Sequence, residues 1–583
     1  MRRQLLTSFS LIFAVTSCGV ASDLEAADEA AAEQEAKAST TTTYKVLANN
    51  DLGMHCVDQD FSVFSILPPF NVVNAQVVKG SSTGKPTRLD ANSVRLTYSA
   101  VADAKGSINS KSIGKTNFWQ YATHLFGASL ATGQGLKGLY MPGEAPSSAP
   151  AAFTWNASLS MFRAEGIPMT PNDDKGQKNY YPLMRVSAYD KSTNKLLASV
   201  DTVLPVSDET TCRNCHATGK AAASGSEIVW ATDADLEIQA RKNILMLHDL
   251  DQGTQLYANR PVLCASCHYS PPLDLAGAGP TAQQKGKPLM SAVMHSFHSD
   301  KMFKDNGQPL SDAPVPPGGT PPAPTAQACY QCHPGANTKC LRGAMADTVD
   351  CQNCHGAMAA VGGATPLLAG GSMDGKNDGK ARRPWTDLPR CQSCHTGDAE
   401  NHLTGLAPLD SDGFRFLNAF RNQDSSASPI LATNKRFAEQ PNTPYRLSKG
   451  HGGVACEGCH GSSHAWWENP DPAANDNVAA KQLQGHSGLI GECSTCHPGT
   501  MANTVNGPHG MHPVNSSQWI SGHHSYAGSS GSNCKSCHGL DLRGTALSEA
   551  FADRTFKIEH GSKTVKKGDA IGCYTCHNGP KGD

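Results

Sequence analysis

The sequence lacks an apolar run long enough to cross a membrane: no segment of its 583 residues reaches the roughly 18 uninterrupted apolar residues of a membrane helix. It also lacks an excess of either charge. The formal net charge is −2, which gives no reason to expect a nucleic-acid partner. After residue 205 the chain is rich in Gly, Pro, Ser and Asn and has few long apolar periods, which in an ordinary chain would leave too little core. Something other than apolar side chains must fill the interior of that part.

Cysteine, in contrast, is abundant, with 21 residues, and most of it follows one repeated pattern, Cys-x-x-Cys-His, which occurs nine times. Two thiols at this spacing add across the vinyl groups of one haem, and the adjoining imidazole then ligates its iron. The pattern therefore predicts nine haem c groups. The predicted haem-attaching cysteines are Cys212, Cys215, Cys264, Cys267, Cys329, Cys332, Cys351, Cys354, Cys391, Cys394, Cys456, Cys459, Cys493, Cys496, Cys534, Cys537, Cys573 and Cys576. The predicted proximal iron ligands are His216, His268, His333, His355, His395, His460, His497, His538 and His577.

Two other chemistries use closely spaced cysteines. A zinc ribbon contains Cys-x-x-Cys pairs, but it does not need histidine directly after the second cysteine. A redox dithiol of the thioredoxin type occurs singly, on a βαβ unit. Histidine is only 23 of the 583 residues, so its presence after all nine pairs favours haem over both alternatives.

The N-terminus reads as an export signal. Two arginines precede an apolar run over residues 5–15, which is the order of an n-region and an h-region. The residues Val-Thr-Ser-Cys at 15–18 resemble a bacterial lipobox, so we expect a signal peptide over 1–17 and a lipid anchor on Cys18. A cut near Ala21, giving a protein without lipid, is the alternative. Residues 18–43 carry many acids and small residues and are expected to form a flexible tether.

Haem attachment outside the cytoplasm agrees with export. We expect an outer-membrane or cell-surface lipoprotein, with the periplasmic side left open, held to the membrane by its lipid alone.

Subtraction of the motifs and Cys18 leaves Cys56 and Cys340. Disulfides persist in exported proteins, so these two cysteines are a candidate pair. The alternatives are that each is a buried, inert thiol, that one of them ligates an iron, or that they join two chains.

Residues 44–205 contain no haem motif and read as strands. Apolar residues alternate with small or polar ones over 94–98 and 153–161, and residues 183–205 read as two strands joined by a polar turn. We find no nucleophile-base set, phosphate loop or paired carboxylates there, and predict no catalytic residue.

The expected fold class is an N-terminal all-β domain, a sandwich or barrel over 44–205, followed by a multihaem cytochrome c domain of short helices and loops wrapped around haems. Residues 206–400 hold five motifs and 401–583 hold four. One helix is readable over 233–250, with Thr232 as its cap and Asp235 completing a capping box, and it presents His248. Residues 309–324 form a Pro-rich connector. The third and fourth motifs start 22 residues apart, which predicts the tightest haem pair.

Histidines outside the motifs number 14, enough for a second ligand on every iron, since neutral imidazole is a good iron ligand. The candidate distal ligands are His248, His295, His298, His402, His451, His486, His512, His523, His524 and His560. His55, His124, His464 and His509 are weaker candidates. Methionine would compete as a distal ligand, but with so much histidine we expect it to be rare.

The lipoprotein signal, the N-terminal β domain and the haem-dense remainder resemble the multihaem c-type cytochromes of the outer surface of metal-reducing bacteria. The best-known decahaem members alternate two β domains with two five-haem domains, whereas this chain has one β domain and nine motifs. The resemblance implies an electron conduit across or outside the cell envelope. Its implied partners are redox-partner cytochromes or a porin-cytochrome conduit, with metal oxides among the extracellular acceptors.

Two other functions remain open. A multihaem respiratory reductase of the nitrite type needs one open iron, which several such enzymes mark with Cys-x-x-Cys-Lys; no such motif occurs here. A filament-forming cytochrome is the other alternative, although a lipid anchor on every subunit suits a long polymer poorly.

Overall fold

The computed structural model describes residues 43–82, 85–144, 151–299 and, with short gaps, 436–579. Between these ranges it describes residue 301 and short pieces from 328 to 395. Several predictions fall outside the described residues: the signal peptide, Cys18 with its tether, the Pro-rich connector, Cys394, His402 and His560.

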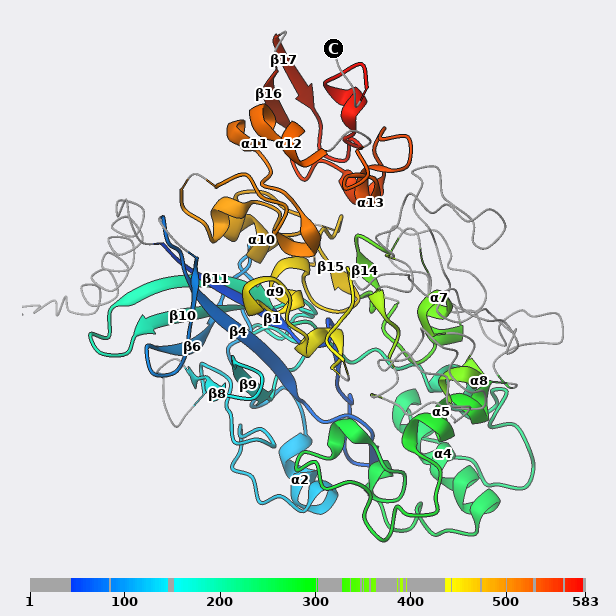
Figure 1. Ribbon diagram of the computed structural model, residues 1–583. Helices are drawn as coiled ribbons and strands as arrows, with labels where there is room; N and C mark the ends of the chain where they lie inside the picture. Colours follow the sequence, from blue (N-terminus) through cyan, green and yellow to red (C-terminus); the bar gives the residue numbers. More distant parts are fainter. Residues whose placement is uncertain are drawn as a thin grey trace, which may run out of the picture.

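The N-terminal part of the chain forms two antiparallel sheets (Figure 1). The first has the order β1 (Tyr44–Asn50), β4 (Asn71–Lys79), β9 (Met161–Ile167), β8 (Thr154–Asn156), with β5 (Thr87–Leu89) also pairing with β4. The second has the order β11 (Leu196–Val203), β10 (Leu183–Asp190), β6 (Val94–Val101), β7 (Ala151–Ala152). Strands β1 and β11 are in contact, so the two sheets share one core.

Strand β4 shows how this core continues into the haem-motif region. Eight of its nine residues are buried, which requires cover on both faces of the sheet. The Gln76 side chain donates to the Gly453 carbonyl oxygen (3.2 Å) and accepts from the Ala455 N–H (2.8 Å). Helix α10 (Asn477–Gln484) adds Ala480 and Leu483 to the same apolar cluster. The haem-motif region is therefore packed directly against the β region.

The predicted hairpin over 183–205 is present as β10 and β11, in antiparallel register. The single strand predicted over 153–161 is wrong, because β8 and β9 form a hairpin with a turn between them. The Asn156 side chain accepts hydrogen bonds from the Leu159 N–H (3.0 Å) and the Ser158 hydroxyl (2.8 Å), and Ser160 takes a φ of 51°. Alternation of apolar residues did not reveal this turn, which the Asn156 side chain stabilises.

The readable helix is α4 (Leu236–Gln252), which begins later than predicted. Asp235 is its N-cap, and its carboxylate accepts from the N–H groups of Glu237 and Ile238. The predicted cap at Thr232 is therefore wrong. Asp235 was placed at the third position of a capping box but occupies the cap itself, as aspartate commonly does.

The rest of the described chain is made of short elements (Figure 1). The helices are α2 (Phe118–Phe126), α3 (Arg213–His216), α5 (Met290–His298), α7 (Cys351–His355), α8 (Met358–Val361), α9 (Cys456–His460), α11 (Ser517–Gly522), α12 (His524–Ala527) and α13 (Lys535–His538). The short strands pair as β2 (His55–Cys56) with β12 (Val206–Ser207), β3 (Phe64–Ser65) with β13 (Val262–Leu263), β14 (Arg342–Gly343) with β15 (Ala465–Trp466), and β16 (Arg554–Ile558) with β17 (Gly561–Val565).

Three of these strand pairs are parallel and join segments far apart in the chain. In the part of the chain that the structure describes, no helix has the length and apolar character needed to span a membrane.

Candidate functional site

Each haem motif closes one helical turn. In seven motifs the histidine N–H donates to the carbonyl oxygen of the first cysteine at 2.8–3.0 Å, as in His216 to Cys212 and His577 to Cys573. The motifs at 351–355 and 456–460 form the α-helices α7 and α9. Residues i, i+3 and i+4 of a helical turn share one face. The backbone therefore presents two thiols and an imidazole on the same side, as covalent attachment of a haem requires.

Eight of the nine motif histidines lie opposite a histidine from another part of the chain. We number the sites 1 to 9 in the order of their motifs. The pairs and their ring-centroid distances are His216–His298 (6.4 Å, site 1), His268–His248 (6.3 Å, site 2), His333–His295 (6.1 Å, site 3), His355–His464 (5.9 Å, site 4), His460–His509 (5.8 Å, site 6), His497–His451 (6.2 Å, site 7), His538–His512 (6.3 Å, site 8) and His577–His523 (5.7 Å, site 9).

These distances match two imidazoles on opposite sides of one metal. Metal–imidazole bonds are about 2.0 Å, and the centroid of a five-membered ring lies about 1.1 Å behind the ligating nitrogen, which places the centroids about 6.2 Å apart. A single pair at this distance is also compatible with an ordinary aromatic contact. What an ordinary contact does not explain is the recurrence of the spacing at eight motifs, each time with a second histidine.

The ring tautomers also suit metal binding. In His268, His295, His298, His509, His523 and His538, Nδ1 lies within hydrogen-bonding distance of a backbone carbonyl oxygen. A carbonyl only accepts, so the proton is on Nδ1 and the lone pair is on Nε2. Such an outer hydrogen bond fixes the ring orientation of metal-ligating histidines.

His248 reaches the same state through a hydroxyl group. Its Nδ1 lies 2.9 Å from Thr254 Oγ1, and that hydroxyl donates to Asp249 Oδ1 at 2.6 Å. Because the Thr254 proton is used on the carboxylate, the hydroxyl oxygen accepts from His248 Nδ1, and Nε2 again carries the lone pair.

Burial keeps the motif imidazoles neutral. It lowers the pKa of the motif residues His216, His333 and His460 to about 4, and that of His512, which faces the motif residue His538, to the same value; the neighbouring histidine in each case adds to the effect. Neutral imidazole is the form that binds iron.

Site 5 is described in part. The His395 ring lies 6.2 Å from the Phe437 ring, and Phe437 in turn lies 4.8 Å from His509. The predicted distal ligand His402 lies outside the described residues and stays a prediction.

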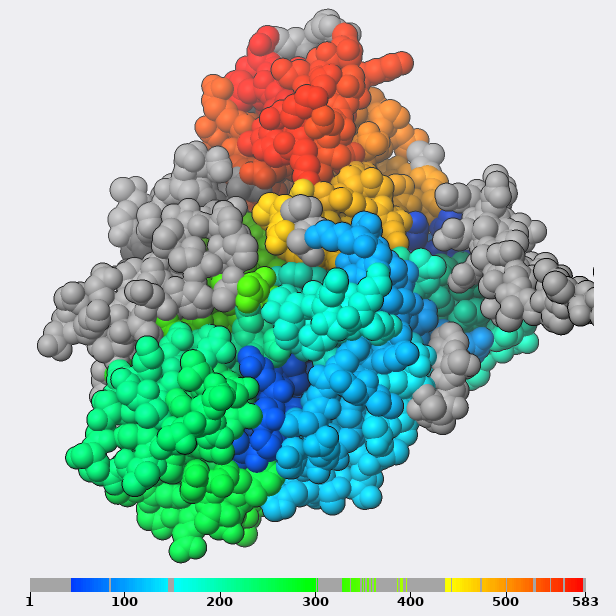
Figure 2. Space-filling view, turned by 180° about the vertical axis from the view of Figure 1, so that it is seen from behind, coloured from blue at the N-terminus to red at the C-terminus, as the bar shows by residue number. Residues whose placement is uncertain are grey.

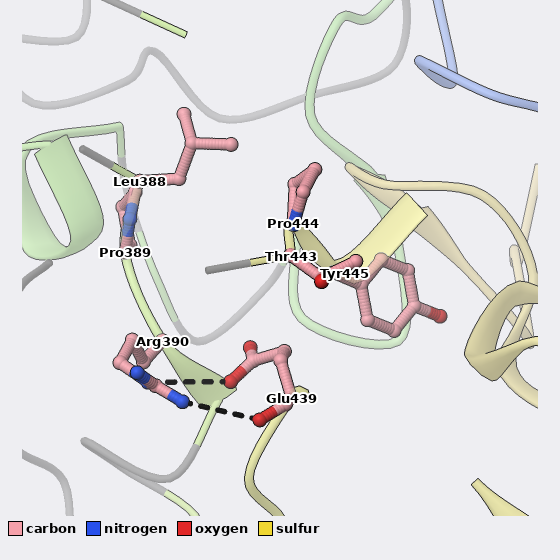
Figure 3. Close-up of a pocket in the computed structure, with 7 residues that line it drawn as sticks. All are labelled: Leu388, Pro389, Arg390, Glu439, Thr443, Pro444 and Tyr445. Atoms are coloured by element: carbon pink, nitrogen blue, oxygen red, sulfur yellow. Dashed lines mark hydrogen bonds and ion pairs between the residues drawn. The ribbon is translucent and has the colours of Figure 1, made fainter. Parts of the chain in front are cut away.

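A small pocket lies beside this motif (Figure 3), lined by Leu388, Pro389, Arg390, Glu439, Thr443, Pro444 and Tyr445. Glu439 holds the start of the motif: its Oε2 pairs with Arg390 Nε (3.5 Å), and its Oε1 accepts from the Cys391 N–H (2.9 Å).

Two histidines that the sequence ranked low are brought to motif histidines. His464 and His509 face His355 and His460, and both have a left-handed backbone, with φ of 62° and 56°. A side chain held at positive φ outside glycine is uncommon and often marks a functional position. The sequence carries no signal for this conformation at either residue, apart from the glycine and proline that flank His509.

Two predicted distal ligands are placed differently. Both ring nitrogens of His486 face oxygen acceptors, Nδ1 the Ser487 carbonyl (2.9 Å) and Nε2 the Glu492 carboxylate (3.1 Å). His524 is exposed at the start of α12. The structure brings neither of them to a motif histidine.

The weaker candidates His55 and His124 are not opposite a motif histidine either. His55 is buried against Asp51, with 3.2 Å between Nε2 and Oδ1, and His124 is exposed near the end of α2.

Cys56 and Cys340, the candidate disulfide pair, pack against one apolar cluster that contains Met54 and Tyr181, and the structure holds both as free thiols. Among the residues that the structure describes, no group of three or more His, Cys, Asp or Glu side chains forms a metal site by itself.

The site geometry defines a set of paired-histidine haem-motif sites distributed along one chain. Comparison of the sequence with protein-family models and with curated proteins, and of the structure with solved structures, gave no match.

Proposed function

We propose that this chain is a nonahaem c-type cytochrome that conducts electrons across or outside the cell envelope to an extracellular acceptor or a partner cytochrome. The observation that carries the proposal is the pairing of eight motif histidines with eight other histidines at 5.7–6.4 Å. Each pair suits one six-coordinate iron, and the two thiols of each motif suit covalent attachment of its macrocycle.

The distribution of apolar residues supports the same proposal. The three apolar clusters of the described residues draw most of their buried side chains from the N-terminal β region, Val73, Met54 and Val63 among them. The buried members from the region after residue 207 are Leu245, Trp467, Ala474, Ala479, Ala480 and Leu483, and the other members from that region are only partly buried. A chain with little apolar core of its own needs another apolar filling to fold, and nine porphyrin discs would supply it.

Two axial histidines favour electron transfer over catalysis. An iron with six ligands has no position for a substrate, so what it supplies when bound is one-electron exchange. The protein's part is to fix the ring orientation of each ligand by Nδ1 hydrogen bonds, to keep the imidazoles neutral by burial, and to set the spacing between neighbouring sites.

Intact-protein mass spectrometry tests the cofactor. We expect the mature chain plus nine haems, and eight or fewer after full maturation would contradict the assignment. Electron paramagnetic resonance (EPR) and absorbance spectra, recorded with and without nitrite or carbon monoxide, test the coordination. We expect mostly low-spin signals that these ligands do not change. A dominant high-spin signal, or nitrite turnover at respiratory rates, would favour a reductase.

The anchor and the partners belong to the same proposal. We expect Cys18→Ala to release the protein from membranes, measured by fractionation, and Ala21→Ser to leave it bound. Retention of the Cys18→Ala protein together with a lipid-free native form would contradict the anchor. Electron microscopy of the purified protein tests the filament alternative.

A further inference from the structure

The proposed ligands of neighbouring sites come from the same short segments of chain, and these shared segments give the sites an order. On α5, His295 faces His333 of site 3, and His298 faces His216 of site 1. Residues three apart on a helix have Cβ atoms about 5–6 Å apart. The motifs of sites 1 and 3 also touch directly, because Asn214 donates to the Gln331 side chain at 2.8 Å. Sites 1 and 3 are therefore neighbours.

Site 2 joins this group through α4. Asn243 donates to the His216 carbonyl oxygen (2.8 Å) at site 1, and His248 on the same helix faces His268 of site 2.

Site 4 is linked to this group of sites through α5. Helix α5 packs against α8, which begins three residues after His355 of site 4. The sequence of neighbours in this arm is 2, 1, 3 and 4.

One segment of 14 residues, 451–464, serves three sites. It contains His451, which faces site 7, His460, the proximal residue of site 6, and His464, which faces site 4. Motif 6 also touches the chain that leads into motif 7, because the Ile490 N–H donates to the Cys459 carbonyl oxygen at 2.7 Å. Site 6 therefore lies between sites 4 and 7.

The opposite ligand of site 6 leads to the C-terminal sites. His509 faces His460 of site 6, and three residues later His512 faces His538 of site 8. The Trp519 ring stacks on His512 at 4.3 Å and 7°, and lies 6.2 Å from His523. Because His523 faces His577, sites 8 and 9 are neighbours.

We propose that site 6 is the branch point of the electron relay, with one arm running through sites 4, 3, 1 and 2 and the other through sites 8 and 9. Site 7 is a side site of site 6, and site 5 approaches site 6 through Phe437. The inference rests on the proposed function. Each step moves one electron from one iron to the next, oxidising the first and reducing the second, with no bond made or broken.

The two arms end at opposite ends of the molecule. In Figure 1 the segment around α4 lies at the bottom, whereas α13, β16 and β17 lie at the top. The view from behind shows the same separation, with the green segment after α4 below and the red C-terminal segment above (Figure 2). An electron that crosses the molecule from one end to the other must therefore pass site 6.

Film voltammetry of the haem-loaded full-length protein tests this order. The protein is attached to the electrode by a tag after Asp583, six residues along the chain from His577 of site 9. The scan rate is raised until electron transfer through the wild-type protein no longer follows the electrode potential. The test variant is His509→Asn, because asparagine tolerates the left-handed backbone at this position but does not replace the imidazole. The identity of its iron ligands sets the reduction potential of a haem. The substitution therefore shifts the reduction potential of site 6 away from those of the neighbouring sites.

Two variants with the same chemical change serve as controls. His451→Asn alters side site 7, and His248→Asn alters site 2 at the far end of the long arm. EPR must show one new high-spin site in each variant, and mass spectrometry must show nine haems in each. These readouts separate failure of the branch point from failure of the proposed function, because a protein without haems fails them before any voltammetry is done.

In His509→Asn we expect the electrons of sites 1 to 5 and of site 7, all of which reach the electrode through site 6, to disappear from the fast signal and to return only at slow scan rates. In His451→Asn and His248→Asn the fast signal should lose at most the one electron of the altered site. If sites 1 to 4 contribute to the fast signal of His509→Asn as they do in His248→Asn, site 6 is not the branch point. If His451→Asn delays them equally, site 7 lies on the main path and the order is wrong.

Discussion

The imidazole rings of His512 and His538 lie 6.3 Å apart and within 8° of parallel, whereas those of His216 and His298 are turned by 76°. Both pairs suit two ligands on one axis, because rotation about that axis leaves the spacing unchanged. The rotation does change the electronic structure expected at each iron.

The first prediction concerns the EPR spectrum. Parallel imidazole planes split the two iron d orbitals that interact with them and give a rhombic low-spin signal, and perpendicular planes leave these orbitals nearly equal and give a signal with one very large g value. We expect both types in the oxidised protein. His512→Ala should remove a rhombic component, and His298→Ala should remove a large-g component. Loss of the same component in both variants would contradict the two geometries.

The second prediction tests the assignment of His464 against that of His486. His464→Asn should convert one low-spin site to high spin, because it removes the imidazole opposite His355 while asparagine keeps the left-handed backbone. His486→Asn should leave every site low-spin, because both ring nitrogens of His486 already face oxygen acceptors. Magnetic circular dichroism counts the high-spin sites. A new high-spin site in His486→Asn alone would reverse the assignment.

The sequence predicts the motif residues of each site, but it predicts few of the histidines that face them. The motif fixes a helical turn, so the thiols and proximal histidines follow from spacing alone. The distal histidines depend on contacts between distant segments, as in His355 with His464. The sequence makes His464 and His509 weaker candidates, and their positive φ, which arises from the fold around them, could not be predicted from it.

The same limit applies to the fold. The hairpin over 183–205 can be predicted because its turn is polar and its strands are apolar. At residues 157–160 the alternation of apolar and polar residues continues through the turn, so the sequence does not show where the strand ends. Residues 453–455 cover β4 and form hydrogen bonds with the Gln76 side chain. These residues are too far from β4 in the chain for a local sequence pattern to predict the contact.

The third prediction concerns a buried carboxylate in the β region. Burial alone would raise the pKa of Asp51, but its hydrogen bond to His55 and the charge of that ring lower it. The charges of Arg446 and Arg163 act in the same direction, so the pKa lies below its ordinary 3.8. A lowered pKa in the folded state stabilises the protein above the unfolded-state pKa, and this contribution is lost as the pH falls through the folded-state value.

We therefore expect Asp51→Asn to lower the free energy of unfolding at pH 7 by about 1.5–3 kcal/mol, the range for a buried hydrogen bond to a charged group. The difference from wild type should begin to shrink as the pH falls below the ordinary 3.8 and should be lost as the pH falls through the lower folded-state pKa of Asp51. Denaturant titrations followed by far-ultraviolet circular dichroism measure both. The control Asp541→Asn removes an exposed carboxylate and should change little. Equal effects of the two variants at pH 7 would show that the Asp51 contacts contribute nothing.

The fourth prediction concerns Cys56 and Cys340, which lie outside the nine motifs. The segment that carries Cys340 is held on the β region, because the Thr338 hydroxyl donates to Glu209 Oε2 (3.0 Å) and its oxygen lies 3.4 Å from Ser207 Oγ. Ser207 is the register partner of Cys56. The Lys339 N–H donates to the Tyr181 hydroxyl at 3.1 Å, beside the same apolar cluster. Burial raises the pKa of both thiols, that of Cys340 to about 11. A buried thiol of high pKa reacts slowly once the protein has folded, so oxidation belongs to the time of folding.

Because we propose that the chain is exported, we expect a Cys56–Cys340 disulfide, formed when a disulfide-carrying oxidant accepts the two electrons and two protons of the thiols. The chain-entropy model gives a loop of this length on the order of 5 kcal/mol, as an upper figure. Labelling of the denatured, unreduced protein should find neither thiol, and mass spectrometry should find a cross-linked 56/340 peptide. Cys56→Ser, Cys340→Ser and the double variant should then lose the same stability, since each breaks the same bond. Two labelled thiols, or single-variant losses that add in the double variant, would show that the cysteines act separately.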